Sequence, residues 1–193
     1  MSADKLYKQM KERRVYRREE LSAFSTAVDR NLKELVKDGR VHKAAAGLYY
    51  RPKNSKWGQV PPNANELVRA FLRTDDFYLT STNSFNLLPL GFTQLSNVAV
   101  VYNTKRVGRF RLNGLIFDFR RPGHRYPDKF SEEFLYIDLL NNLDKVPEYS
   151  KDLDHKLKAA LKKFPSKKLE KSAMYFGTRK AQLKLKELLS DAA

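Results

Sequence analysis

VYRREELSAFSTAVDRNLKELVKDGRVHKAAAGLYYRP, residues 15–52, is the stretch that decides the fold of the N-terminal part of the chain. Within it, apolar side chains recur at the i, i+4, i+7 and i+8 spacing of one helix face, at Val28, Leu32, Leu35 and Val36. This spacing predicts a helix with one face on a core. Thr26, Asp29, Arg30, Lys33 and Lys37 fall on the opposite, mainly cationic face.

The ends of this helix, and a shorter helix before it, can also be predicted. Ser25 or Thr26 can cap its first turn, and Gly39 can end it because glycine readily adopts a left-handed backbone. Residues 19–24 favour a short helix that points Leu21 and Phe24 inward. Two helices with so small a break at Ser25 predict a helix-turn-helix.

A basic hairpin is expected directly after the longer helix. Residues 40–43 and 48–51 indicate two short strands, and the turn Ala45-Ala46-Gly47 supplies the glycine that a tight hairpin needs. Residues 3–14 favour a first helix before this motif. A helix-turn-helix with such a hairpin is typical of a winged helix, which places one helix in the DNA major groove while the hairpin contacts phosphates.

Composition favours an anionic partner. The chain has 193 residues, 41% of them hydrophobic, and a formal net charge of +16. Residues 1–60 carry +8, residues 61–150 carry +1 and residues 151–193 carry +7. Clustered cations at both ends suggest contact with nucleic acid, because binding then releases condensed counterions; a generally basic, soluble surface is the alternative.

The absence of cysteine excludes disulfides and thiol chemistry and allows a reducing compartment. The first residues lack an apolar signal core, and nowhere do about eighteen apolar residues run together. We therefore expect a cytoplasmic protein without membrane contact.

The rest of the chain is expected to form a second domain. Residues 53–65 read as a linker because they contain Pro61 and Pro62 and few periodic apolar positions, so the boundary is placed near residue 60. Trp57 could stack on a base or pack the linker onto a domain; packing is favoured because large aromatics are mostly buried.

The fold class is thus expected to be α+β, with a winged helix-turn-helix at residues 1–60 and an α+β domain closed by C-terminal helices at residues 61–193. A helix is predicted at 65–73, a short strand at 77–80 and a weak helix at 84–88. Strands follow at 97–102, 106–112 and 115–119, the last two joined by the hairpin dipeptide Asn113-Gly114. Helices are expected from Ser131, over 151–163, after Pro165-Ser166 and after Gly177-Thr178.

A search for catalytic chemistry yields little. The three histidines are scattered, and no glycine-rich phosphate loop or nucleophile elbow is present, so we expect no metal, no cofactor and no enzymatic activity. The acids Asp75-Asp76, Asp118 and Glu132-Glu133 could hold magnesium in a nucleic-acid enzyme, but acids in turns and at helix starts more often serve as caps.

Two segments resemble a known family. Residues 31–52, NLKELVKDGRVHKAAAGLYYRP, resemble the helix-to-wing segment of the AbiEi-type antitoxin regulators, and FSEEFLYIDLLNNL at 130–143 is similar to their second domain. The resemblance implies a bacterial type IV toxin–antitoxin component that represses its own operon, with a nucleotidyltransferase as cognate toxin and abortive-infection phage defence in some members. The second domain looks shorter than in longer members, which leaves open a stand-alone regulator without antitoxin activity.

Sequence-specific binding of double-stranded DNA is therefore the expected function. Arg30 can pair bidentately with guanine, and the Thr26 methyl group suits thymine. Five C-terminal lysines could form a second phosphate track or a solvated face: Lys162, Lys163, Lys167, Lys168 and Lys171. An inverted-repeat operator bound by two copies is the usual arrangement for such a domain. The predicted DNA-contacting residues are Arg17, Arg18, Ser25, Thr26, Asp29, Arg30, Lys33, Lys43, Arg51 and Lys53.

Overall fold

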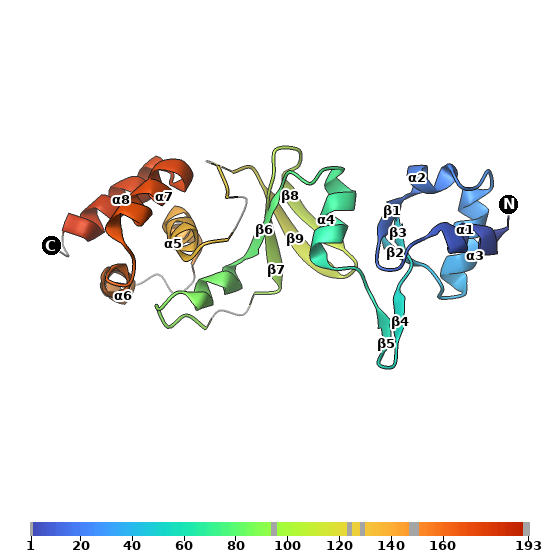
Figure 1. Ribbon diagram of the computed structural model, residues 1–193, viewed down its shortest axis with the longest axis horizontal. Helices are drawn as coiled ribbons and strands as arrows, with labels where there is room; N and C mark the ends of the chain where they lie inside the picture. The colour runs from blue at the N-terminus through green and yellow to red at the C-terminus, as the bar shows by residue number, and fades with distance from the viewer. Residues whose placement is uncertain (1, 94–95, 123–124, 128–129, 147–150, 191–193) are drawn as a thin grey trace. The chain divides into compact units, whose positions relative to one another are not determined.

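A computed structural model describes residues 2–93, 96–122, 125–127, 130–146 and 151–190 (Figure 1). It mixes helices and strands, which confirms the α+β class. The elements are α1 Ala3–Gln9, β1 Val15–Arg17, α2 Arg18–Ser22, α3 Val28–Lys37, β2 His42–Ala45, β3 Leu48–Tyr50, β4 Lys53–Ser55, β5 Gly58–Val60, α4 Ala64–Leu72, β6 Tyr78–Ser81, η1 Thr82–Leu87, β7 Val98–Tyr102, β8 Gly108–Leu112, β9 Leu115–Arg120, α5 Glu132–Asn141, η2 Leu143–Lys145, α6 Lys151–Leu161, α7 Ser166–Phe176 and α8 Arg179–Ser190.

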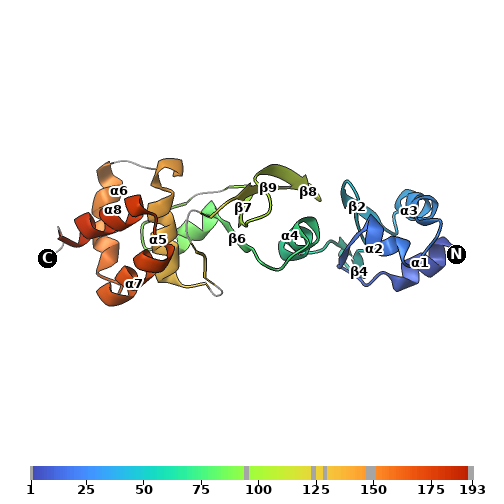
Figure 2. The same ribbon diagram turned by 90° about the horizontal axis from the view of Figure 1, so that it is seen from above.

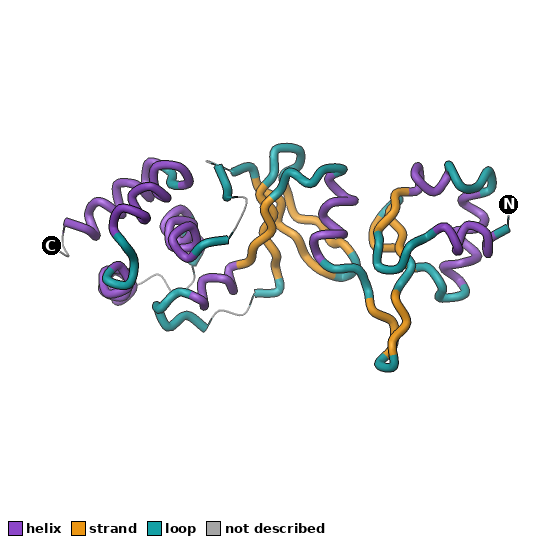
Figure 3. The backbone as a smooth tube through the Cα atoms, in the orientation of Figure 1, coloured by secondary structure: helices purple, strands orange, loops and turns teal. Residues whose placement is uncertain are grey.

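The described strands form three sheets (Figure 3). The first has the order β1-β3-β2 and is antiparallel, with Val15 opposite Tyr50 and His42 opposite the same tyrosine on the other side. The second is the two-stranded hairpin of β4 and β5. The third has four strands in the order β6-β7-β9-β8, and β6 pairs with β7 in antiparallel fashion.

The chain divides into two compact units. Unit 1 consists of Met1–Phe77 with Arg109–Phe117, and unit 2 consists of Tyr78–Gly108 with Asp118–Ala193. This division differs from the boundary expected near residue 60. The difference arises because α4 packs against β1 and its C-terminal carbonyls accept hydrogen bonds from Arg17, so the chain as far as residue 77 stays with unit 1.

The core of unit 1 is built by α1, α3 and the segments between them. Leu6, Leu21, Leu32 and Leu35 are fully or almost fully buried there. Val36, expected on the same helix stripe, is instead 38% exposed, because position 36 lies at the edge of that stripe. At the other edge of the stripe, Asn31 is buried. The buried face of α3 therefore contains Asn31 in place of Val36 and is rotated slightly from the predicted face.

The segment expected to be a linker is an ordered hairpin. Residues 53–60 form β4 and β5, joined by a turn at Lys56-Trp57, and Trp57 is 87% exposed rather than packed on a domain. In Figure 1 and Figure 3 this hairpin projects away from β1, β2 and β3 of the same unit. The sequence of polar residues gave no alternating apolar pattern, so its strands were not expected.

The turn between β8 and β9 completes unit 1. Asn113 has φ 48° and Gly114 has φ 81°, as a tight hairpin turn requires. The Asn113 backbone N–H donates to the Ala44 carbonyl at 2.7 Å, and the Tyr50 hydroxyl donates to Asn113 Oδ1 at 3.0 Å. Thus the β8–β9 turn docks on the β2–β3 hairpin, which is more than 60 residues earlier in the chain.

In unit 2 the central helix is α5, which is buried from Phe134 to Leu140. Its Ser131 side chain caps the N-terminus by accepting a hydrogen bond from the Phe134 N–H at 3.1 Å. α7 and α8 pack on α5, and α6 packs on α8 (Figure 2). Among the described residues, no helix is both long and apolar enough to cross a membrane.

Candidate functional site

The outward face of α3 is an exposed cationic surface. Thr26, Arg30, Lys33 and Lys37 are all exposed, whereas the opposite side of the helix is buried in the core of unit 1. Within the described part of the chain, the three cations of this face form no ion pair, and neither does Glu34 beside them. These cations are therefore available to an anionic partner. We call Thr26, Arg30, Lys33 and Lys37 the α3 face.

Asp29 lies beside this face but is paired with Arg18. The Arg18 guanidinium donates two hydrogen bonds to the Asp29 carboxylate, at 2.9 and 2.6 Å. These bonds lower the pKa of Asp29, so the carboxylate is charged and neutralised by its partner. Because Arg18 is paired with Asp29, Arg18 is no longer a free cation for a ligand. Asp29 in turn adds no unpaired negative charge beside the α3 face.

Ser25 was predicted to contact DNA, and the structure contradicts this. Its side chain is buried, and Oγ accepts hydrogen bonds from the Asn31 amide at 2.8 Å and from the Ala27 N–H at 3.2 Å. The N-cap position of α3 is Ala27, so neither Ser25 nor Thr26 makes the expected cap. The role of Ser25 is to satisfy buried donors where α3 begins.

Arg17 was predicted to meet phosphate, but it binds another part of unit 1. Its Nε donates to the Ala70 carbonyl at 2.8 Å and a terminal nitrogen donates to the Phe71 carbonyl at 2.6 Å. A guanidinium is well suited to the unpaired carbonyls at a helix C-terminus. Arg17 therefore holds the end of α4.

Arg51 is the third predicted contact that the structure assigns to folding. Its guanidinium carbon lies 4.2 Å from the centre of the Tyr7 ring, and its terminal nitrogens lie 3.4 Å from the Met10 carbonyl and from Glu12. The side chain is only 25% exposed. These contacts tie β3 to α1, where the sequence offered no sign of a partner.

Lys43 on β2 and Lys53 on β4 are exposed, and within the described residues neither has an ion-pair partner. The β2–β3 hairpin is partly covered, since Ala44 of β2 accepts the hydrogen bond from Asn113. The predicted residues of unit 1 that are exposed and have no ion-pair partner among the described residues are thus Thr26, Arg30, Lys33, Lys43 and Lys53.

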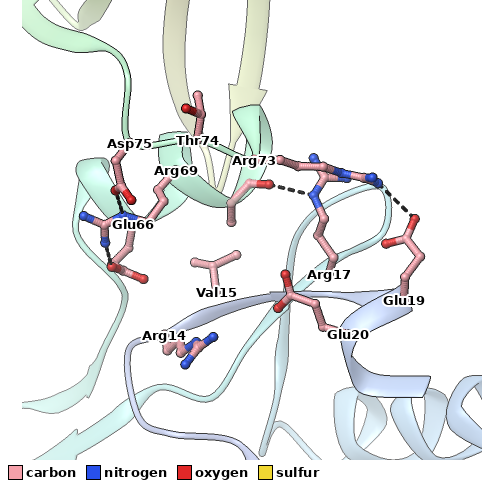
Figure 4. Close-up of a pocket in the computed structure, with 11 residues that line it drawn as sticks. Arg14, Val15, Arg17, Glu19, Glu20, Glu66, Arg69, Arg73, Thr74 and Asp75 are labelled. Atoms are coloured by element: carbon pink, nitrogen blue, oxygen red, sulfur yellow. Dashed lines mark hydrogen bonds and ion pairs between the residues drawn. The ribbon is translucent and has the colours of Figure 1, made fainter. Parts of the chain in front are cut away.

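A cleft of about 600 Å³ lies between β1, α2 and α4 of unit 1 (Figure 4). Four arginines and four acids line it, and many of them pair with one another: Arg73 with Glu19 at 3.2 Å, and Arg69 with both Glu66 and Asp75. Because its charges balance, the cleft does not have the excess of cations that a phosphate site needs.

The β4–β5 hairpin was not predicted from the sequence, although base stacking by Trp57 was one of the two alternatives considered. Lys56 and Trp57 are exposed there, and the Lys56 ammonium lies 5.2 Å from the centre of the indole ring. The sequence features that could have indicated a hairpin are Gly58, the polar segments on both sides of it and the prolines that flank them. That pattern also fits a linker.

Unit 2 contains a buried polar cluster. The Tyr102 hydroxyl and the Asn142 amide donate to Asp138 Oδ1, at 3.2 and 3.1 Å. Burial raises the pKa of Asp138 to about 6, although both hydrogen bonds act in the opposite direction. Burial likewise raises the pKa of Tyr102. The small cavity beside this cluster holds no group of three or more metal-ligating side chains, and none is found among the other described residues.

The lysines expected to form a second phosphate track are exposed in unit 2. Lys162 and Lys163 follow α6, and Lys167, Lys168 and Lys171 lie on α7. Lys168 lies 3.9 Å from Glu133, an ion pair at the limit of contact distance. The exposure of these five lysines is expected for a second phosphate track and equally for a solvated face, so both alternatives stay open.

Fold and surface together define a mixed α+β protein that exposes a cationic helix face in its N-terminal unit. The family model described as "Family of unknown function (DUF6088)" matches residues 4–111, which is more than half of the chain, and the protein belongs to this family. No curated protein and no solved structure matches the chain.

Proposed function

We propose that this protein is a sequence-specific DNA-binding repressor of its own operon. In this proposal α1–α3 and β1–β3 form a winged helix, which has the element order helix, strand, helix, helix and hairpin that unit 1 follows. α3 would enter the major groove, and Lys43 and Lys53 would contact the flanking phosphates.

The α3 face is the observation that carries this proposal. Arg30, Lys33 and Lys37 project from one side of a helix whose other side is buried, and the nearby Asp29 is neutralised by Arg18. Unpaired cations on a helix face suit the phosphates and guanine edges of a duplex, and the Thr26 methyl group suits thymine. The net charge of +16 adds long-range attraction to DNA.

Two copies of the protein would bind an inverted-repeat operator, as domains with a single recognition helix usually do. The half-sites would then be about 34 to 36 Å apart, or a multiple of that distance. The operator itself is expected upstream of the protein's own gene, where occupancy represses transcription.

The test is fluorescence-anisotropy binding to the duplex upstream of the gene and to a scrambled duplex, each over a series of salt concentrations. We expect a preference for the upstream duplex of about a thousandfold or more. Log affinity should fall by about 0.9 per neutralised phosphate for each decade of salt. Equal binding to both duplexes would overturn the proposal, and magnesium-dependent cleavage of either would point to a nucleic-acid enzyme.

We extend the proposal to antitoxin activity in a type IV toxin–antitoxin system with a nucleotidyltransferase toxin. The support is the resemblance of residues 31–52 and 130–143 to AbiEi-type regulators, together with exposed apolar side chains on α7 and α8, such as Met174 and Leu183. Coexpression with a nucleotidyltransferase encoded next to the gene should restore growth. Repression without growth rescue would leave a stand-alone regulator.

A further inference from the structure

The hairpin of residues 53–60, which we call the arm, exposes the only tryptophan of the chain at its tip. Trp57 is 87% exposed, the highest value among the exposed large apolar side chains described. Single exposed apolar residues are common, but an indole in water at the end of a projecting hairpin is an efficient anchor for a partner.

The arm tip is held in one conformation. The Ser55 hydroxyl donates to the Gly58 carbonyl at 2.7 Å and accepts from the Trp57 N–H at 3.2 Å. Gly58 has φ 109°, a value that side chains with a Cβ rarely adopt. A preorganised tip loses little conformational entropy on binding. These hydrogen bonds and the Gly58 conformation fix the backbone from which the exposed indole projects.

The base of the arm is joined to the end of α3. The Gln59 amide donates to the Gly39 carbonyl at 3.1 Å, directly after α3, and Gln59 Oε1 lies 2.7 Å from His42 Nε2. On the other side, the Arg13 guanidinium donates to the Pro61 carbonyl at 3.3 Å. Hydrogen bonds thus connect the arm to the element that carries the α3 face.

The charge of the arm matches that of a nucleic acid. Lys53 and Lys56 are exposed, and residues 53–60 include no acid. Proteins that enter the minor groove combine cations on the phosphates with an apolar side chain against the bases. A protein partner would not require two lysines with no compensating acid. The bond from the Gln59 amide to the Gly39 carbonyl places the base of the arm beside the end of α3, the helix proposed to enter the major groove, and this favours duplex DNA.

We infer that the arm is a second DNA contact: Lys53 and Lys56 bind phosphates, and the Trp57 indole packs against bases in the minor groove beside the groove occupied by α3. This inference rests on the proposed DNA binding by α3. It adds a minor-groove contact outside the helix-turn-helix and identifies the residue that makes it.

Trp57 itself reports the contact, since the chain has no other tryptophan. The full-length protein is titrated with the upstream duplex while indole emission and its quenching by acrylamide are recorded. In the free protein the indole should be fully open to acrylamide. On binding, its emission should shift and acrylamide should quench it several-fold less, whereas unchanged emission and quenching would overturn the inference.

Variants separate the two kinds of contact, measured by anisotropy of the labelled upstream duplex. Trp57→Ala should weaken binding by a factor of roughly 5 to 150 with an unchanged salt slope, because stacking on a base is not ionic. Lys53→Gln with Lys56→Gln should lower the salt slope by about 1.8, which corresponds to two phosphates. Trp57→Phe should restore part of the affinity.

Leu87→Ala is the matched control, since it removes another exposed apolar side chain, 66% exposed at the end of η1. If upstream and scrambled duplexes still differ in affinity but Trp57→Ala binds like the wild type, the arm inference fails and the proposed function stands. If neither duplex is preferred and the indole is nevertheless protected, the arm contact is supported and sequence-specific repression fails.

Discussion

Arg30 and Arg17 carry the same guanidinium group, and their neighbours give them different roles. Arg30 is exposed and unpaired among the described residues, whereas Arg17 donates hydrogen bonds to the Ala70 and Phe71 carbonyls. Ser25 shows the same contrast with Thr26: one hydroxyl is buried on Asn31 and the other faces solvent. Partners therefore decide which polar residues of unit 1 can meet a ligand.

Arg30→Ala should weaken binding to the upstream duplex by about 1 to 3 kcal/mol and relax the preference at one base pair, because it removes a bidentate contact to guanine. Anisotropy titrations against duplexes substituted at each position measure both effects. The control is Arg179→Ala, which removes an equally exposed arginine from α8. Wild-type affinity and base preference in Arg30→Ala would remove this residue from DNA readout.

Ser25→Ala should lower the free energy of unfolding by about 1 to 3 kcal/mol, since the buried Asn31 amide would lose an acceptor. Urea unfolding followed by circular dichroism measures the loss. The exposed neighbour Thr26→Ala should leave stability almost unchanged. Unchanged stability of Ser25→Ala together with weakened DNA binding would instead identify Ser25 as a DNA-contacting residue.

At the scale of the element, short segments are held by contacts from distant parts of the chain. β1 is three residues long and owes its position to β3, more than 30 residues later, and to α4. The α4 helix ends at Arg73, which has φ 58°, and its last carbonyls are bound by Arg17. Neither element would persist alone at such a length.

Arg17→Leu should therefore destabilise unit 1 by about 1.5 to 3 kcal/mol, the range for hydrogen bonds to a charged donor. Urea unfolding provides the measurement, with Arg109→Leu, at an exposed position of β8, as the control. The salt slope of DNA binding should not change, because Arg17 faces α4. A slope reduced by about 0.9 with unchanged stability would identify Arg17 as a phosphate contact.

Elements with strong local signals could be predicted from the sequence. The Asn113-Gly114 turn and the helix starts expected at Ser131 and after Pro165-Ser166 and Gly177-Thr178 place strands and helices close to their observed bounds. β1 and the arm could not be predicted, because strands of three residues are too short to show a periodicity. The partners of Arg17 and Arg51 likewise depend on tertiary contacts, so exposure of a cation cannot be inferred from local sequence.

At the scale of the whole molecule, the chain combines a large excess of positive charge with one deeply buried carboxyl group. Exposed lysines on α7 and near the end of α6 add to the cations of unit 1, so the net charge of +16 is spread over both units. Asp138 is an exception, since it lies against Tyr102, Asn142 and the apolar core of unit 2, and the nearby cations Arg120 and Lys145 only partly offset its burial. The stability of the protein should consequently depend on pH through this group.

The pKa of Asp138 is raised from 3.8 to about 6 on folding. A raised pKa stabilises the folded state below pH 3.8, and that contribution is lost as pH rises through about 6. Between pH 4 and pH 7 the wild type should lose about 2 to 3 kcal/mol relative to Asp138→Asn, which cannot ionise. Urea midpoints of both proteins at several pH values measure the difference, and parallel pH profiles would contradict the role of Asp138.

The docking of Asn113 on Ala44 and Tyr50 has a consequence for protein synthesis. During translation, residues 1–77 leave the ribosome well before β8 and the first part of β9, which belong to the same unit. The edge of the β2–β3 hairpin therefore stays uncovered until residues up to 117, which include the β8–β9 turn, have emerged. A nascent chain halted earlier would present that open strand edge to other chains, so ribosome pausing before this point would favour aggregation.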